Sequence, residues 1–152
     1  MLMEKKEMQR LVDTFPQRCR EAGMKVTPQR MAVYSMLVHT DSHPSAEEVY
    51  HSIRKQVPAV SLGTVYKILD MLHEHGFLLK VATQNQTARF DARVDFHHHA
   101  LCDDCGKLLD ISGNLDAALL AQASAVNFVP SACEVLFHGR CQECAEKPAL
   151  MS

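Results

Sequence analysis

The sequence predicts an α+β protein with a helical first half and a second half in which short strands accompany clusters of metal-binding residues. Helix-start and helix-stop signals recur through residues 1–76, whereas the C-x-x-C pairs lie after residue 100. The charge balance also changes, from 11 Lys/Arg and 9 Asp/Glu in residues 1–84 to 5 and 9 in residues 85–152. We therefore expect two units, residues 1–84 and 95–152, joined by a hinge at residues 85–94.

Four helices are expected in the first half, because apolar residues recur there at helical spacing between recognisable caps. Thr27 and Pro28 form an N-cap followed by a proline at the first helical position. Ser45 and Glu48 have the spacing of a capping box. Gly76 can end the last helix, because glycine readily adopts the left-handed conformation found there. The expected helices are residues 4–22, 28–38, 46–56 and 61–75.

Two strand patterns, residues 77–83 and 88–91, follow these helices around the polar turn at residues 84–87. Several short helices followed by a hairpin is the order of a winged helix-turn-helix. The helix at residues 61–75 is then the one expected in the DNA major groove. The residues expected at the DNA are Thr64, Tyr66 and Lys67, which lie outside its apolar face, and the basic residues Arg30 and Lys25.

The second half contains two C-x-x-C pairs separated by residues 106–140. Two residues between the cysteines is the spacing at which both thiolates can bind one ion, and two such pairs complete the tetrahedral shell of structural zinc. Strands are expected at residues 97–102, 108–111 and 129–137, with a helix at 115–126 and a short final helix. The expected ligands of one Zn²⁺ per chain are Cys102, Cys105, Cys141 and Cys144.

Other uses of the cysteine pairs are disulfides, a rubredoxin-like iron site and dithiol redox catalysis. Disulfides need an oxidising compartment. The N-terminus has no apolar export segment, and no stretch is apolar for long enough to span a membrane. We therefore expect a cytoplasmic protein with reduced cysteines.

A His-x-His motif lies directly before the first cysteine pair, at His97 and His99. Residues two apart on a strand point to the same side, so these two imidazoles are expected to converge while His98 points elsewhere. Nitrogen ligands beside a thiolate site suggest a second metal with a different role, because the two donor sets select different ions.

Seven short motifs occur along the chain in a fixed order. They are Thr27-Pro28-Gln29-Arg30, His43-Pro44-Ser45-Ala46, Thr64-Val65-Tyr66, Arg89-Phe90-Asp91, His97-x-His99, Cys102-x-x-Cys105-Gly106-Lys107 and Cys141-x-x-Cys144. Together, over about residues 8–147, they resemble the ferric uptake regulator family of metal-dependent bacterial transcription factors. The resemblance implies a DNA-binding domain followed by a small α/β dimerisation domain, a homodimer, and double-stranded operator DNA with inverted-repeat half-sites. It implies no enzymatic activity.

Within this family the chain is most similar to the peroxide-responsive repressors, because Asp110 stands where iron-uptake regulators generally have glutamate. In these repressors, iron-catalysed oxidation by peroxide modifies a ligand histidine, here His43 or His97. The resemblance maps a regulatory site for one Fe²⁺ or Mn²⁺ per chain onto His43, Asp91, His97, His99 and Asp110.

The chain departs from the family pattern in two places. A further family metal site would fall at Phe96, His98, Asp110 and Cys133, and we expect it to be absent because Phe96 cannot bind a metal. The expected recognition helix reads Tyr66-Lys67-Ile68-Leu69, which is closer to iron-uptake regulators. Three alternatives therefore stay open: an iron-responsive regulator, a C-x-x-C redox enzyme, and a zinc-stapled interaction module that does not bind DNA.

Overall fold

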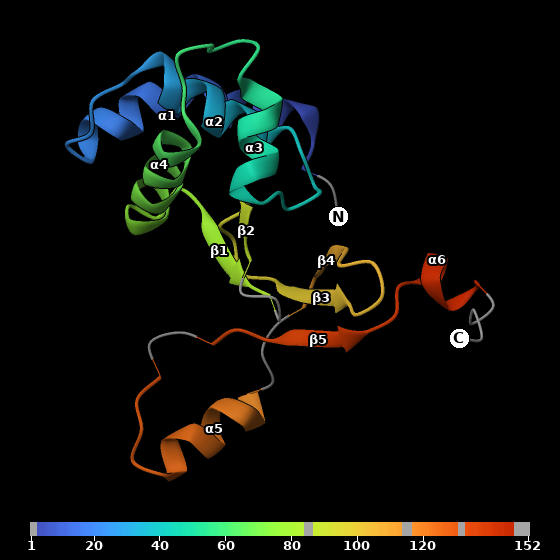
Figure 1. Cartoon of the computed structure of the whole chain (residues 1–152). Coiled ribbons are helices and arrows are strands. Elements are labelled where there is room, and N and C mark those ends of the chain that lie inside the picture. The colour runs from blue at the N-terminus through green and yellow to red at the C-terminus, as the bar shows by residue number, and fades with distance from the viewer. Residues whose placement is uncertain (1–2, 84–86, 114–116, 131–132, 148–152) are drawn as a thin grey trace. The chain divides into compact units, whose positions relative to one another are not determined.

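The structure is a computed structural model that describes residues 3–83, 87–113, 117–130 and 133–147. The chain divides between Val94 and Asp95 into two compact units, the N-terminal unit and the C-terminal unit. Helices make up most of the N-terminal unit, whereas the C-terminal unit is built on a three-stranded sheet (Figure 1).

The N-terminal unit contains four helices. They are α1 (Lys5–Glu21), α2 (Pro28–Val38), α3 (Ala46–Ile53) and α4 (Leu62–Glu74). Helices α2 and α3 begin at the predicted caps. The Thr27 hydroxyl accepts a bond from the Arg30 backbone N–H, and the capping box of Ser45 and Glu48 is complete. Helix α3 ends three residues earlier than expected. Beyond Ile53 the chain continues in turns, in which the backbone N–H groups of Gln56 and Val57 both donate to the Ile53 carbonyl.

Aromatic stacking lies at the centre of this unit. The rings of Phe15 and Tyr34 stack with their centroids 4.1 Å apart, and Phe77 contacts both of them edge-on. The Arg18 guanidinium donates to the Tyr34 hydroxyl at 3.1 Å and lies 4.5 Å from the centre of the Phe77 ring. Because these residues come from α1, α2 and the segment that follows α4, the cluster holds these elements in one arrangement.

A hairpin completes the N-terminal unit. Strand β1 (Leu79–Ala82) pairs antiparallel with β2 (Ala88–Asp91), and residues 84–86 of the expected turn lie outside the described residues. Phe90 is buried in the core of the unit, and Val81, on the opposite face of the hairpin, is buried as well. Helices followed by this hairpin form a winged helix-turn-helix, so the predicted fold class is confirmed for this unit.

The C-terminal unit is organised around strand β3 (His98–Cys102). Strand β4 (Leu108–Ile111) pairs antiparallel with one edge of β3, and β5 (Leu136–Gly139) pairs parallel with the other. Helix α5 (Ala117–Ala125) precedes β5, and the short helix α6 (Gln142–Ala145) follows it. Residues 115–116 of the expected helix lie outside the described residues.

The expected strand at residues 129–137 is wrong for most of its length. None of the described residues 129–130 and 133–135 belongs to a strand, and the strand begins only at Leu136. A strand needs a neighbour, and β3 supplies one only opposite residues 136–139. Val129 has no cover, with 91% of its surface exposed.

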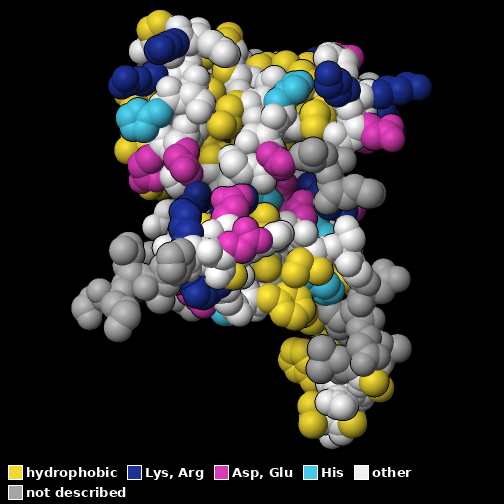
Figure 2. Space-filling view, turned by 90° about the vertical axis from the view of Figure 1, so that its right-hand side faces the viewer, with side chains coloured by type: hydrophobic (Ala, Val, Ile, Leu, Met, Phe, Trp, Pro, Cys, Tyr) yellow, Lys and Arg dark blue, Asp and Glu magenta, His cyan; other side chains and the backbone are white. Residues whose placement is uncertain are grey.

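Apolar side chains remain exposed on the C-terminal unit. Val126, Phe128 and Val129 follow α5, and hydrophobic side chains gather on this part of the molecule (Figure 2). On the sheet, Leu109 and Phe137 lie on either side of Ala100 in the same row and are exposed as well. Exposed apolar surface of this kind is typical of a protein–protein interface.

The aromatic cluster generates a stability prediction. Phe15→Ala removes a fully buried ring, so we expect the free energy of unfolding of the N-terminal unit to fall by about 3–5 kcal/mol. Denaturant unfolding followed by helical circular dichroism measures this change. Gln9→Ala, on the exposed side of α1, is the matched control and should change it by less than about 0.5 kcal/mol. A loss of less than about 1 kcal/mol for Phe15→Ala would contradict the packing described.

Candidate metal centres and the DNA-contacting helix

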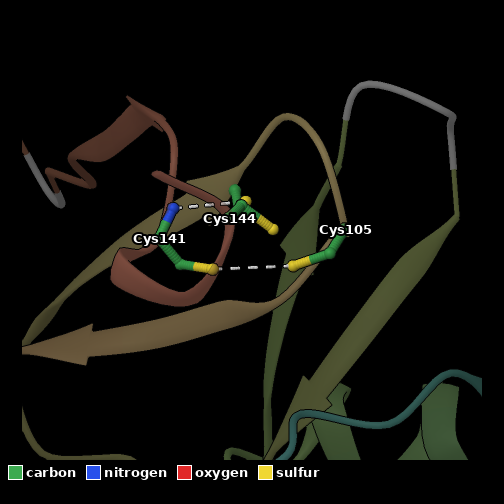
Figure 3. A group of neighbouring side chains, drawn as sticks. Cys105, Cys141 and Cys144 are labelled. Atoms are coloured by element: carbon green, nitrogen blue, oxygen red, sulfur yellow. Dashed lines mark hydrogen bonds between the residues drawn. The ribbon is translucent and has the colours of Figure 1, made fainter. Parts of the chain in front are cut away.

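The four cysteines of the C-x-x-C pairs lie together at the ends of β3 and β5. Their sulfur atoms are all within 4.8 Å of one another, and the Sγ atoms of Cys105 and Cys141 are 3.8 Å apart. In Figure 3 the labelled thiols of Cys105, Cys141 and Cys144 point toward a common centre. Zinc–sulfur bonds of about 2.3 Å in a tetrahedron place the sulfurs about 3.8 Å apart. The arrangement therefore fits a four-thiolate zinc site.

The same distance excludes a disulfide, whose sulfur atoms are about 2.05 Å apart. All six cysteines are free thiols. The backbone N–H of Cys141 donates to Cys102 Sγ at 3.3 Å, and this bond is the main cause that lowers the pKa of Cys102 to about 6. Hydrogen bonding with the Cys141 and Cys105 sulfurs raises the pKa of Cys144 to about 12. Four adjacent thiolates therefore require a cation to balance their charge.

Three residues of the predicted regulatory site meet inside the C-terminal unit. His97 and His99 approach each other with their Nε2 atoms 3.0 Å apart, and Asp110 Oδ1 lies 3.6 Å and 3.8 Å from these two atoms. The pairing of β3 with β4 sets this geometry, because His99 lies directly opposite Asp110 in the register. His97 lies just before β3, where its Nδ1 faces the Asp95 carbonyl at 2.7 Å. That contact leaves Nε2 to bind a metal.

The other two predicted residues meet inside the N-terminal unit. His43 Nε2 lies 3.3 Å from Asp91 Oδ2, and both side chains are at least nine-tenths buried. Asp91 stands at the end of β2, where its second oxygen accepts from the Arg93 backbone N–H at 2.7 Å. Each unit thus contains one buried cluster of imidazole and carboxylate ligands: the N-terminal half-site, His43 and Asp91, and the C-terminal half-site, His97, His99 and Asp110.

Helix α4 exposes the face that the helical phase predicts. Val65, Ile68 and Leu69 are buried, whereas Tyr66 is 41% exposed and Lys67 is exposed. The Ser61 hydroxyl caps the helix by accepting from the Thr64 backbone N–H.

Three of the predicted DNA contacts are hydrogen-bonded to neighbouring residues. The Thr64 hydroxyl lies 2.8 Å from the Ser61 hydroxyl. The Tyr66 hydroxyl donates to Glu47 Oε1 on α3 at 2.5 Å, a bond that lowers the pKa of the Glu47 carboxyl. Arg30 donates to the Lys25 carbonyl at 2.5 Å, and the Lys25 side chain is exposed.

A known protein family matches most of the chain. The model of the ferric uptake regulator family matches residues 21–138. The chain belongs to this family.

Several relatives are named for their response to peroxide. The peroxide operon regulator of Bacillus subtilis (strain 168) is 33% identical over 129 residues, which cover 84% of this chain and 89% of that protein. The peroxide-responsive repressor PerR of Staphylococcus epidermidis is 30% identical, covering 84% of this chain and 86% of that protein. The structure of the Helicobacter pylori ferric uptake regulator superposes with a TM-score of 0.74 at 25% identity, covering 97% of this chain and 98% of that one.

Family membership decides between some of the open alternatives. Ferric uptake regulators are transcriptional regulators that bind DNA and form dimers, and they are not enzymes, so the C-x-x-C redox enzyme is excluded. Among the described residues, no helix is both long and apolar enough to cross a membrane.

Sequence analysis missed the ion pairs that connect the two cysteine pairs of this regulator. Arg140 Nε donates to Asp104 at 2.6 Å, and its Nη2 donates to the Cys144 carbonyl at the same distance. Lys107 donates to Glu143 at 2.8 Å. Each of these ion pairs spans 36 residues of sequence and joins the first cysteine pair to the second. Only the parallel pairing of β5 with β3 brings these charges together.

The Arg140–Asp104 and Lys107–Glu143 ion pairs are expected to slow the release of zinc, so a variant that lacks one of them should lose zinc faster. Arg140→Gln removes the bonds to Asp104 and to the Cys144 carbonyl, so we expect zinc to be lost to a chelating dye about 10-fold faster than from the wild type. The absorbance of the dye–zinc complex measures the rate. Lys147→Gln removes a nearby positive charge and should leave the rate unchanged. Equal rates for Arg140→Gln and the wild type would show that the bridges do not retain the ion.

Proposed function

We propose that this chain is a metal-dependent transcriptional repressor that senses peroxide by iron-catalysed oxidation of its ligand histidines. The observation that carries this proposal is the pair of buried half-sites, one in each unit, whose donors are nitrogen and oxygen only. The similarity to peroxide-responsive repressors over 84% of the chain supports it.

The two donor sets of the chain suit different metals. Four thiolates favour zinc in a closed tetrahedral site, which holds structure but leaves no position for chemistry. Three imidazoles and two carboxylates favour Fe²⁺ or Mn²⁺, which accept more than four nitrogen and oxygen ligands. We propose one Zn²⁺ per chain at the cysteines and one Fe²⁺ or Mn²⁺ per chain at His43, Asp91, His97, His99 and Asp110.

Sharing one ion between the half-sites would make DNA binding depend on metal. His43 and Asp91 belong to the unit that carries α4, whereas the other three ligands belong to the sheet of the C-terminal unit. An ion that binds all five ligands would favour the arrangement of the units in which the two half-sites meet. The size of the effect is the difference between the ion's affinity for that arrangement and its affinity for arrangements in which the half-sites are apart. A shift from 1:99 to 99:1 in favour of that arrangement needs about 5.5 kcal/mol.

The repressor would act as a dimer on an inverted repeat. The exposed apolar surface after α5 and on the sheet is the surface that we propose a second copy covers. Each copy would place α4 in the major groove, with Thr64, Tyr66 and Lys67 at the bases. Arg30 and Lys25 would neutralise phosphates, and because the unit has few such cations the salt dependence should be modest.

Peroxide would act on the ligands themselves. Iron held by these residues would catalyse cleavage of the O–O bond of hydrogen peroxide, with no net change in its own oxidation state. The imidazole of His43 or His97 would supply the two electrons: one peroxide oxygen would enter a ring C–H bond, and the other would leave as water. An oxidised imidazole is a poorer ligand, so the site would bind iron less tightly and iron would dissociate. The repressor would then release the operator.

One other regulator is a candidate function. An iron-responsive regulator is favoured by the sequence Tyr66-Lys67-Ile68-Leu69 on α4, and it would respond to iron without histidine oxidation. Membership of a family of DNA-binding regulators excludes the zinc-stapled interaction module that does not bind DNA.

The shared-ion proposal predicts the effect of removing one ligand. His43→Ala should abolish most of the gain in operator affinity that Mn²⁺ produces, because the N-terminal unit then retains only Asp91. Fluorescence anisotropy with labelled operator, with and without Mn²⁺, measures the gain. His75→Ala removes an exposed histidine at the end of α4 and should retain the full gain. A wild-type gain in His43→Ala would reject the shared ion.

The oxidation proposal predicts a specific mass change. Peroxide should add the mass of one oxygen atom to peptides containing His43 or His97 in the Fe²⁺ form only, because Mn²⁺ and Zn²⁺ do not reduce peroxide in this way. Peptide mass spectrometry after treatment of the Fe²⁺, Mn²⁺ and zinc-only forms measures it. Equal oxidation in the zinc-only form would rule out a metal-catalysed reaction.

A further inference from the structure

His43 has an unusual backbone conformation. Its φ is +49°, in the left-handed region that residues other than glycine seldom adopt, because the Cβ atom then crowds the backbone. Such a conformation persists only where surrounding contacts hold it, and it often marks a functional position. The contacts around His43 therefore identify the residues that keep it in this conformation.

Three consecutive residues of β2 each contact the segment His43-Pro44. Arg89 Nη1 donates to the His43 carbonyl at 3.4 Å, and the Phe90 backbone N–H donates to the Pro44 carbonyl at 3.1 Å. Asp91 lies 3.3 Å from the His43 ring. The buried Phe90 side chain anchors the strand in the core, so the segment is attached to a rigid element.

Glu48 connects these contacts to helix α3. Its Oε2 atom accepts from the Ser45 backbone N–H at 2.7 Å and from Arg89 Nη1 at 2.9 Å. One carboxylate oxygen therefore closes the capping box of α3 and also fixes the guanidinium that reaches the His43 carbonyl. The ligand histidine, the start of α3 and strand β2 share this one set of bonds.

We infer that Arg89 and Glu48 are positioning residues for His43 and thereby set the metal affinity of the regulatory site. The inference rests on the proposed function, since it requires His43 to be a ligand. Neither residue needs to touch the ion. A preformed ligand position lowers the cost of ordering His43 when metal binds, so loss of the bridge weakens binding.

An ordinary surface ion pair in the same unit offers the matched control. Lys80 and Asp70 are 2.8 Å apart and are exposed to a degree comparable with Arg89 and Glu48. Exposed pairs of this kind contribute little to stability. Lys80→Met should therefore leave Mn²⁺ affinity unchanged. Comparison with Arg89→Met then separates the positioning of His43 from the loss of one positive surface charge.

The experiment measures Mn²⁺ affinity of the zinc-loaded full-length protein from the paramagnetic resonance signal of free Mn²⁺. Arg89→Met should weaken binding about 10- to 100-fold, the range typical of residues that orient a ligand. Arg89→Lys keeps the positive charge but lacks the planar guanidinium. Its Mn²⁺ affinity should lie between that of the wild type and that of Arg89→Met. Glu48→Gln keeps an oxygen for the Ser45 N–H and should weaken binding less than Glu48→Ala. Zinc content and circular dichroism identify any variant that fails to fold, and the conservative variants then decide the outcome.

The effect of Arg89→Met in the His43→Ala background separates positioning from general damage. If Arg89 acts through His43, adding Arg89→Met to His43→Ala causes no further loss of Mn²⁺ affinity. An equal loss in both backgrounds overturns the inference. Wild-type affinity in Arg89→Met, together with weak binding in His43→Ala, also overturns it but leaves the proposed function standing. Wild-type affinity in His43→Ala shows that the proposed function itself has failed.

Discussion

Strand β3 is the element on which the C-terminal unit depends. Its antiparallel pairing with β4 places His99 opposite Asp110, and its parallel pairing with β5 places Cys102 opposite Gly139, two residues before Cys141. A shift of one residue in either register would turn the ligands to the other face of the sheet. The C-terminal half-site and the four-cysteine cluster are therefore both positioned by β3, through its hydrogen bonds to β4 on one side and to β5 on the other.

The N-terminal unit uses β2 in a comparable way. This strand belongs to the wing hairpin, supplies Asp91, and holds His43 through its residues Arg89 and Phe90. Glu48 extends the same bonds to α3, which packs beside α4 in the helix-turn-helix. The proposed ligands of this half-site are thus bonded to the elements that support α4. In the proposed function, a change at these ligands would reach α4 through β2 and α3.

The proposed chemistry of the two sites would explain why one chain needs both. Four thiolates would hold zinc in a closed shell that leaves no position for peroxide, and the ion pairs of Arg140 and Lys107 join the two segments that carry those thiolates. The imidazole and carboxylate ligands would instead hold the metal at which peroxide reacts. In this proposal the regulator loses its signal metal and keeps the zinc that supports its fold.

The sequence by itself determined the features that depend on near neighbours in the chain. The caps at Thr27 and Ser45, the buried face of α4, the convergence of His97 with His99 and the cysteine spacing all follow from residues within a few positions of one another. The tertiary structure decided the start of β5, the bridge from Arg89 to Glu48 and the ion pairs between the cysteine pairs. These features join residues that are 36 or 41 positions apart, or require a partner strand. Local patterns carry no information about which distant group will complete a hydrogen bond, because the packing of the whole unit selects that partner.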